Sequence, residues 1–180
     1  MTTSRSAPRR KFKVDFLAGE YGGEGRSHRT QPVQDIAARK ARGCDLALEM
    51  NTRVRIDGRL PGGALDSAHV RVASVVPFIV MKGMALYDRL KAKDAWDIYF
   101  CLVNSPGGLD ALVQEFLPHV QHGLVVEGLT KIREKFLSPD HVGPRLVADF
   151  DELTDQDARD LRQRDAFERA NYLLAKLGVA

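Results

Sequence analysis

The sequence predicts an α+β fold, in which a small mixed β-sheet packs against a C-terminal helical portion. Length and composition are the first observation, because 180 residues with 44% hydrophobic and 28% charged side chains suit one domain with a substantial core. The second is that apolar and polar residues alternate only before residue 74, whereas apolar residues recur at three- and four-residue spacing after it. Strands followed by helices are typical of domains that segregate the two.

The clearest expected strand is 11–18, with the sequence KFKVDFLA. Phe12, Val14 and Phe16 alternate with charged residues, so this strand buries one face and places Asp15 on the opposite one. A glycine-rich loop is expected to follow it. Shorter strands are expected at 44–48, 52–56 and 70–73, separated by turns at 57–58 and 61–63.

Helices are expected throughout the second part of the chain. Ser74 is a suitable N-cap for the first helix, Pro77 falls in its first turn, and Gly178 ends the last helix. The expected ranges are 75–90, 93–104, 108–117, 122–137 and 155–177. The sequence therefore predicts a β-rich core over 11–74 and a helical portion of the same domain over 75–180.

The N-terminal residues 1–10 are polar and lack periodicity, so we expect a disordered basic arm. The first 14 residues include Arg5, Arg9, Arg10, Lys11 and Lys13 but no acid, although the whole chain has a formal charge of only +3. Such an arm either contacts phosphates, with nucleic acid as the obvious polyanion, or is a solvated terminus.

Composition also bears on the cellular compartment. No apolar run approaches the roughly 18 to 20 residues that a membrane-spanning helix needs, and the N-terminus lacks the hydrophobic stretch of a signal peptide. Cys44 and Cys101 show neither a disulfide framework nor a metal-binding spacing, so both are expected to be reduced and buried. These features predict a cytoplasmic protein without a membrane partner.

The segment 75–102 holds the residues best suited to chemistry. Lys82 lies in an apolar helix, where an ammonium group needs an anionic partner. Helical periodicity places Lys82 and Arg89 on one stripe, and Asp94 and Asp97 on one face of the next helix. From the residues alone, two interpretations stay open: an ion pair that only fixes the two helices, and a catalytic arrangement.

The order of these residues resembles a known signature. The run Lys-Gly-x-Ala-Leu at 82–86, followed by Asp-Arg-Leu-Lys-x-Lys-Asp-x-x-Asp-Ile-Tyr at 88–99, is similar to the C-terminal signature of the AbiEii-type nucleotidyltransferase toxins. These toxins belong to the nucleotidyltransferase superfamily. The segment KVDFLA at 13–18 resembles the later core strand of that superfamily, in which one carboxylate helps to hold a divalent metal ion. The resemblance covers about 11–104 and implies that Asp15 is that carboxylate.

In enzymes of this kind, an acceptor hydroxyl attacks the α-phosphorus of a nucleoside triphosphate (NTP), and related toxins modify RNA acceptors such as tRNA. The resemblance implies Mg²⁺ and NTP as ligands and Lys82, Asp94 and Asp97 as catalytic residues. Lys82 would hold the triphosphate, either aspartate would orient that lysine or the attacking hydroxyl, and Arg89 would steady a phosphate or the helix pair. The implied role is the toxin of a toxin–antitoxin or phage-defence system, with a cognate antitoxin as partner.

The chain departs from the superfamily pattern at one point. The first motif of the superfamily, a Gly-Ser turn followed by an Asp-x-Asp pair, belongs ahead of the strand that KVDFLA matches, and the ten residues before Lys11 contain no acid. Without these two carboxylates, metal-dependent transfer is expected to be impaired. We expect either that the motif is encoded upstream of Met1, or that the chain is a non-catalytic module that binds nucleotide, RNA or a protein partner.

Overall fold

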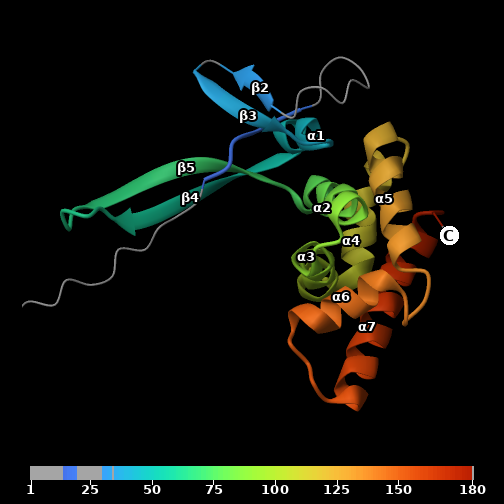
Figure 1. The fold of residues 1–180 in the computed structure, drawn as a ribbon. Coiled ribbons are helices and arrows are strands. Elements are labelled where there is room, and N and C mark those ends of the chain that lie inside the picture. The colour runs from blue at the N-terminus through green and yellow to red at the C-terminus, as the bar shows by residue number, and fades with distance from the viewer. Residues whose placement is uncertain (1–13, 20–29, 34, 180) are drawn as a thin grey trace, which may run out of the picture.

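The structure is a computed structural model that describes residues 14–19, 30–33 and 35–179, and it confirms the α+β class (Figure 1). The expected basic arm, the start of the first expected strand and most of the glycine-rich loop lie outside these residues. All the described strands precede residue 74, and all the described helices except one follow it. The β-structure forms two separate sheets instead of one.

The helices from Val75 to Lys176 surround one apolar core and together form what we call the helical body. They are α2 (Val75–Arg89), α3 (Ala92–Asn104), α4 (Gly108–Phe116), the short 3₁₀ helix η1 (Leu117–His119), α5 (Gly123–Lys135), α6 (Val142–Phe150) and α7 (Gln156–Lys176). Ile79, Leu86, Ile98, Phe116 and Leu129 are completely or almost completely buried in this core. The apolar stripes that predict the helices therefore meet one another, as amphipathic packing requires.

Helix α6 is absent from the sequence prediction. It begins after His141 and contains Pro144 in its first turn, where the amides have no acceptor within the helix. Proline is therefore compatible with this position, although the Ser-Pro and Gly-Pro pairs of the segment suggest a loop. Val147 and Ala148 on this helix are fully buried.

The first sheet has three strands in the order β1–β3–β2 and is mixed. Strand β1 (Leu17–Ala18) pairs in parallel with β3 (Ile36–Lys40), and β2 (Thr30–Val33) pairs with β3 in the antiparallel direction. The sequence analysis missed β2 and β3, having assigned the first of them to the glycine-rich loop. Of the expected strand 11–18, only Leu17–Ala18 is a strand among the described residues.

The expected strand at 44–48 is wrong, because these residues belong to helix α1 (Cys44–Glu49). A short apolar run does not by itself distinguish a strand from a helix. Gly43 adopts a positive φ of 82° immediately before the helix, a conformation that glycine reaches without strain. The helix turns Leu46 into the core and leaves Leu48 68% exposed, so the two do not share a buried face as a strand would require.

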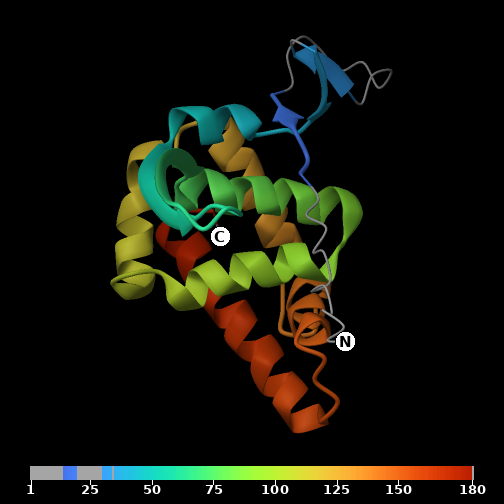
Figure 2. The ribbon, with the colours of Figure 1, turned by 90° about the vertical axis from the view of Figure 1, so that its left-hand side faces the viewer.

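The second sheet is a two-stranded antiparallel ribbon that projects from the helical body in Figure 1 and points toward the viewer in Figure 2. Its strands, β4 (Asn51–Arg59) and β5 (Leu65–Ala73), are each longer than the sequence predicts. Most of their residues are exposed. Main-chain pairing continues beyond the residues that show apolar alternation, and this pairing leaves no pattern in the sequence.

Two glycines allow helices α2 and α5 to cross closely. A Cβ atom at Gly83 would lie 2.6 Å from Ile132 Cγ1 and 2.7 Å from the carbonyl oxygen of Gly128. A Cβ atom at Gly128 would lie 2.7 Å from Val80 Cγ1. The helices cannot keep this separation with a larger residue at either position.

We predict that Gly83→Ala lowers the free energy of unfolding by about 2 kcal/mol, because overpacking at the crossing outweighs the higher helix propensity of alanine. Gly62→Ala is the matched control, because a Cβ atom there meets nothing within 4 Å. Urea denaturation of both variants and the wild type measures the difference. An unchanged midpoint for Gly83→Ala would show that the crossing tolerates a methyl group.

Candidate functional site

A tight connection between α2 and α3 assembles the charged residues singled out from the sequence. Leu90 adopts a left-handed conformation with φ of 47°, and its amide donates to the Leu86 carbonyl to end α2. Helix α3 begins two residues later, after Lys91. The chain therefore reverses within two residues, and the first turn of α3 lies against the last turns of α2.

Asp94 is the centre of the resulting ion-pair cluster. Its two oxygens accept hydrogen bonds from Arg89 Nε at 2.7 Å and Nη2 at 2.8 Å, and Oδ1 also accepts one from Lys82 Nζ at 3.1 Å. The Asp94 residue is 1% exposed. A buried carboxylate with this many charged donors is fully compensated, and the bidentate contact fixes the guanidinium plane of Arg89.

Asp97 completes the cluster one helical turn later. Its Oδ2 lies 2.5 Å from Lys82 Nζ, and Lys93 Nζ lies 2.7 Å from Oδ1. Lys82 therefore sits between two carboxylates, and its ammonium lies 5.6 Å from the Phe78 ring centroid. The sequence predicts an anionic partner for Lys82, and the structure provides two of them; the Lys82 side chain is only 21% exposed.

The cluster keeps Asp94 and Lys82 charged. Burial, the largest influence on Asp94, opposes ionisation, but hydrogen bonds from Arg89 and Lys82 outweigh it and lower the pKa of Asp94. Burial likewise opposes the charge on Lys82, and hydrogen bonds to Asp97 and Asp94 outweigh it and raise the pKa of Lys82. With Lys93, the cluster contains three cations and two anions.

A cleft of about 470 Å³ lies between helix α2 and the three-stranded sheet. Lys82 and Arg89 line one side of it, and Asp15 and Leu17 line another. The amide of Arg39 donates to the Phe16 carbonyl, and this parallel contact places the segment before β1 at the cleft. The structure therefore brings the implied metal ligand Asp15 to the same cleft as Lys82 and Arg89, whereas Asp94 and Asp97 are not among the residues that line it.

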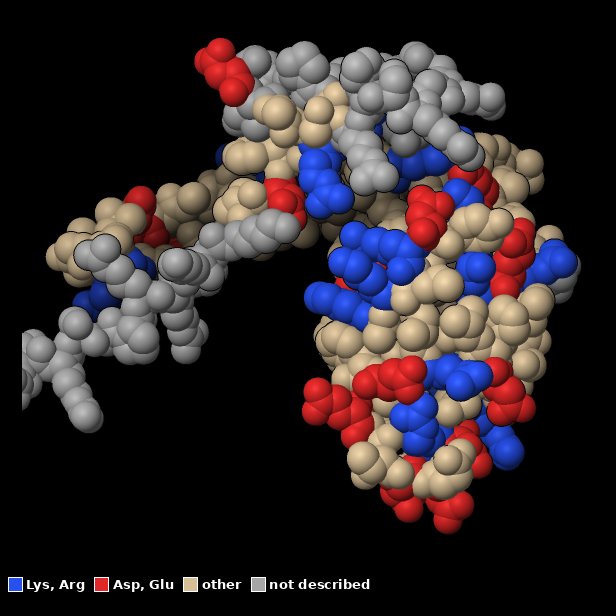
Figure 3. Space-filling model, in the orientation of Figure 1, with Lys and Arg blue, Asp and Glu red and all other residues tan. Residues whose placement is uncertain are grey.

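Sequence reasoning missed several residues of this cleft. Arg39, Lys40 and Arg42 line it from the end of β3 and the turn after it, and Asp88 lines it from α2. Figure 3 shows lysine and arginine side chains gathered on the helical body where α2 and α3 lie. The basic run Arg39-Lys40-Ala41-Arg42 was a usable signal, but without the strand β3 nothing in the sequence connected it to Lys82.

The fit of a magnesium ion rests on the carboxylates of the cleft. Among the described residues, no three His, Cys, Asp or Glu side chains are grouped to hold a metal ion. Mg²⁺ usually keeps several waters and takes one or two protein carboxylates in addition to substrate phosphates. Asp15 therefore fits as a single contact for an ion that arrives with a triphosphate.

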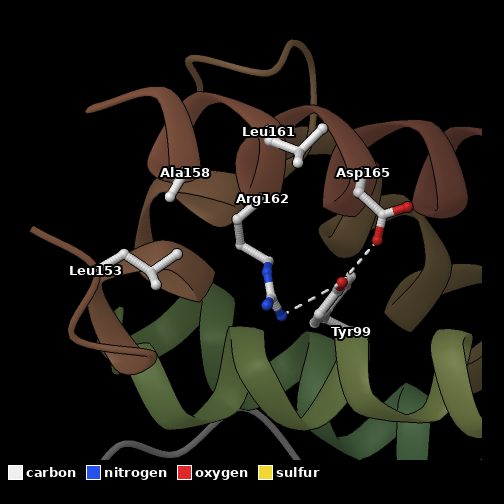
Figure 4. Close-up of a pocket in the computed structure, with 6 residues that line it drawn as sticks. All are labelled: Tyr99, Leu153, Ala158, Leu161, Arg162 and Asp165. Atoms are coloured by element: carbon white, nitrogen blue, oxygen red, sulfur yellow. Dashed lines mark hydrogen bonds between the residues drawn. The ribbon is translucent and has the colours of Figure 1, made fainter. Parts of the chain in front are cut away.

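A second cavity, of about 410 Å³, lies between α3 and α7 (Figure 4). Tyr99 donates a 2.6 Å hydrogen bond to Asp165, and Arg162 lies 5.2 Å from the Tyr99 ring centroid. Burial, followed by the hydrogen bond to Asp165, raises the pKa of Tyr99 to about 12. Arg169 also donates to Asp165. These polar groups satisfy one another and connect two helices, so the cavity has fewer groups available for a ligand than the basic cleft.

Comparison of the chain with protein-family models, with curated proteins and with solved structures gave no match. The resemblance to the AbiEii-type toxins therefore remains a prediction. Within the described residues, no helix is both long enough and apolar enough to cross a membrane. The two cysteines are free, as expected, but only Cys44 is buried, whereas Cys101 is half-buried.

We predict that Asp94→Asn lowers the free energy of unfolding at neutral pH by about 3 kcal/mol, because it leaves partly buried cations without their shared carboxylate. The pKa of Asp94 is lower in the folded state than its ordinary value of 3.8. The ionised carboxylate therefore stabilises the folded state at any pH above 3.8. This contribution is lost as the pH falls through the lowered pKa. The difference in the free energy of unfolding between wild type and variant, measured by urea denaturation, should therefore become smaller at acidic pH.

The control is Asp149→Asn, which removes an exposed carboxylate that accepts a hydrogen bond from Arg159. We expect its effect to stay below about 1 kcal/mol, as is usual for exposed ion pairs. Equal effects of the two substitutions would contradict a central role for Asp94.

A further prediction concerns Arg42, which connects the turn after β3 to helix α5. Its guanidinium donates to both oxygens of Glu127, at 2.8 and 2.9 Å from Nε. These hydrogen bonds are the main reason that the pKa of Glu127 falls to about 2, and Lys131 adds to the effect. We expect Arg42→Ala to raise this pKa toward 4.5, measured by NMR titration of the Glu127 carboxyl carbon. A value near 2 in the variant would show that other groups hold the carboxylate.

Proposed function

We propose that the protein binds the triphosphate of an NTP in the cleft between α2 and the three-stranded sheet. On this proposal it transfers the nucleotide to an RNA hydroxyl, as the toxin of a cytoplasmic toxin–antitoxin or phage-defence system. The observation that supports it most is the convergence of five cations on one cleft. They are Arg39, Lys40, Arg42, Lys82 and Arg89. They come from strand β3, the turn after it and helix α2.

The charge and size of the cleft suit a triphosphate. Two acids, Asp15 and Asp88, also line it, so the lining side chains carry a positive excess. The volume of about 470 Å³ is within the range of small-molecule sites. Arginine is suited to bidentate recognition of phosphate oxygens, and lysine acts on them as a point charge.

The contacts of Lys82 favour the role in which the aspartates orient this lysine over the role in which they orient the attacking hydroxyl. Asp94 and Asp97 both hold its ammonium group, so they orient the lysine at the floor of the cleft. In the transfer, the acceptor oxygen forms a bond to the α-phosphorus while the bond to pyrophosphate breaks, and the hydroxyl proton passes to solvent water. Preorganised cations stabilise the charge that builds up on the phosphate oxygens, and they need no rearrangement at that moment.

A second candidate is a non-catalytic module that binds nucleotide, RNA or an antitoxin-like partner in the same cleft. The pairing inside the cluster favours it, because Lys82 and Arg89 already have carboxylate partners and hold α2 against α3 without a ligand. Both candidates require an anionic ligand in the cleft. They differ in whether a covalent product forms.

We predict that Arg39→Gln weakens binding of Mg²⁺-NTP about tenfold, because it removes one charge-assisted contact to phosphate. Arg39 is exposed and lies outside the buried cluster, so this variant tests the cleft without disturbing the fold. Lys82→Met is the companion variant and should weaken binding further. Isothermal titration with each of the four NTPs measures the affinities, and Arg164→Gln on the exposed face of α7 is the charge-matched control.

Equal affinities of wild type and both cleft variants would overturn the proposal. Transfer is tested separately by incubating the protein with NTP labelled at the α-phosphate and total RNA. Label in RNA that disappears with Lys82→Met supports the enzyme. Binding without label in RNA or protein supports the module instead.

A further inference from the structure

The ribbon of β4 and β5 has two chemically different faces. In the antiparallel register, residues opposite each other share a face, and successive residues alternate between faces. One face carries Arg53, Arg55 and Arg59 from β4, with His69 and Arg71 from β5. The other carries only apolar or small side chains along most of its length, among them Val54, Ile56, Ala68, Val70 and Val72.

The arginine face lacks enough acids to neutralise it. Arg55 pairs with Asp57 at 2.8 Å, which leaves Arg53, Arg59 and Arg71 without an ion pair to any described residue. These residues are exposed, and arginine side chains are visible on the projecting ribbon in Figure 3. The face therefore carries an excess of three positive charges on a structure that stands away from the helical body.

The register of Arg53 is the most informative detail. It is paired directly with Arg71 across the two strands, where like charges destabilise the sheet. The neighbouring pair, Arg55 with His69, places two more basic side chains side by side. An anion lying across the strands would relieve the repulsion between Arg53 and Arg71, because Asp57, the acidic side chain on this face, is paired with Arg55.

We propose that the arginine face of the ribbon binds the phosphodiester backbone of a nucleic acid. Nine residues per strand give the ribbon a length of roughly 30 Å, and arginines two residues apart along β4 are spaced by roughly 6.8 Å. A linear polyanion contacts such a row repeatedly, whereas a single small anion contacts only one pair. A two-stranded ribbon also has the width that the major groove of duplex DNA admits. The apolar face is then directed away from the nucleic acid.

The test compares Arg53→Gln/Arg71→Gln with wild type in fluorescence-anisotropy titrations over a range of salt concentrations. The probes are a 20-base-pair DNA duplex, an RNA duplex of the same sequence and its single strand. For the preferred probe, neutralising two phosphate contacts should reduce the magnitude of the slope of log affinity against log salt by about two and weaken binding at least tenfold at low salt. The preferred probe identifies which nucleic acid provides the backbone.

Arg145→Gln/Arg164→Gln is the control, because it removes the same charge from exposed positions on α6 and α7. The proposal is overturned if none of the three probes binds, if the ribbon variant keeps the wild-type salt slope, or if the control variant loses as much affinity. NTP affinity should be unchanged in the ribbon variant. A failure of NTP binding in the cleft would therefore not affect the test of nucleic-acid binding by the ribbon, so each proposal can be overturned without the other.

Discussion

The buried carboxylate of Asp94 holds helices α2 and α3 in one relative arrangement, and the basic cleft depends on that arrangement. Removing a carboxylate from water costs several kcal/mol, so the folded state retains it only with well-placed cationic donors. Arg89 and Lys82 provide them from the facing helix. Neither helix can rotate or slide by a turn without separating these groups. The cluster therefore fixes which residues of α2 point into the cleft.

The same pairing explains how cations can remain at the floor of a partly closed cleft. Without Asp94 and Asp97, burial would favour a neutral Lys82, and the cleft would lose part of its attraction for an anion. With them, the pKa of Lys82 is raised and its ammonium stays in place. A structural ion pair and a ligand site are thus compatible here. Lys82 and Arg89 line the cleft, whereas the carboxylates that hold them do not.

The helical body and the ribbon differ in what stabilises them. The body has an extensive apolar core and a close glycine crossing between α2 and α5. The ribbon has main-chain pairing but little burial along nine residues of each strand. A ribbon of this kind is marginal in isolation and derives support from where it joins the body and from whatever contacts its faces. Its unpaired arginines are consistent with a surface adapted to a charged ligand.

The sequence by itself determined most helices of the second half and the need of Lys82 for a carboxylate partner on the next helix. Both depend on local periodicity and on the need of a buried ion for a partner. Helix α1 was misjudged as a strand because six residues carry too little periodicity, and α6 was missed because Pro144 suggests a loop. Only the tertiary structure decided that Arg39 shares a cleft with Asp15 and Lys82. That contact depends on the parallel pairing of β1 with β3, which joins segments distant in sequence and leaves no local pattern.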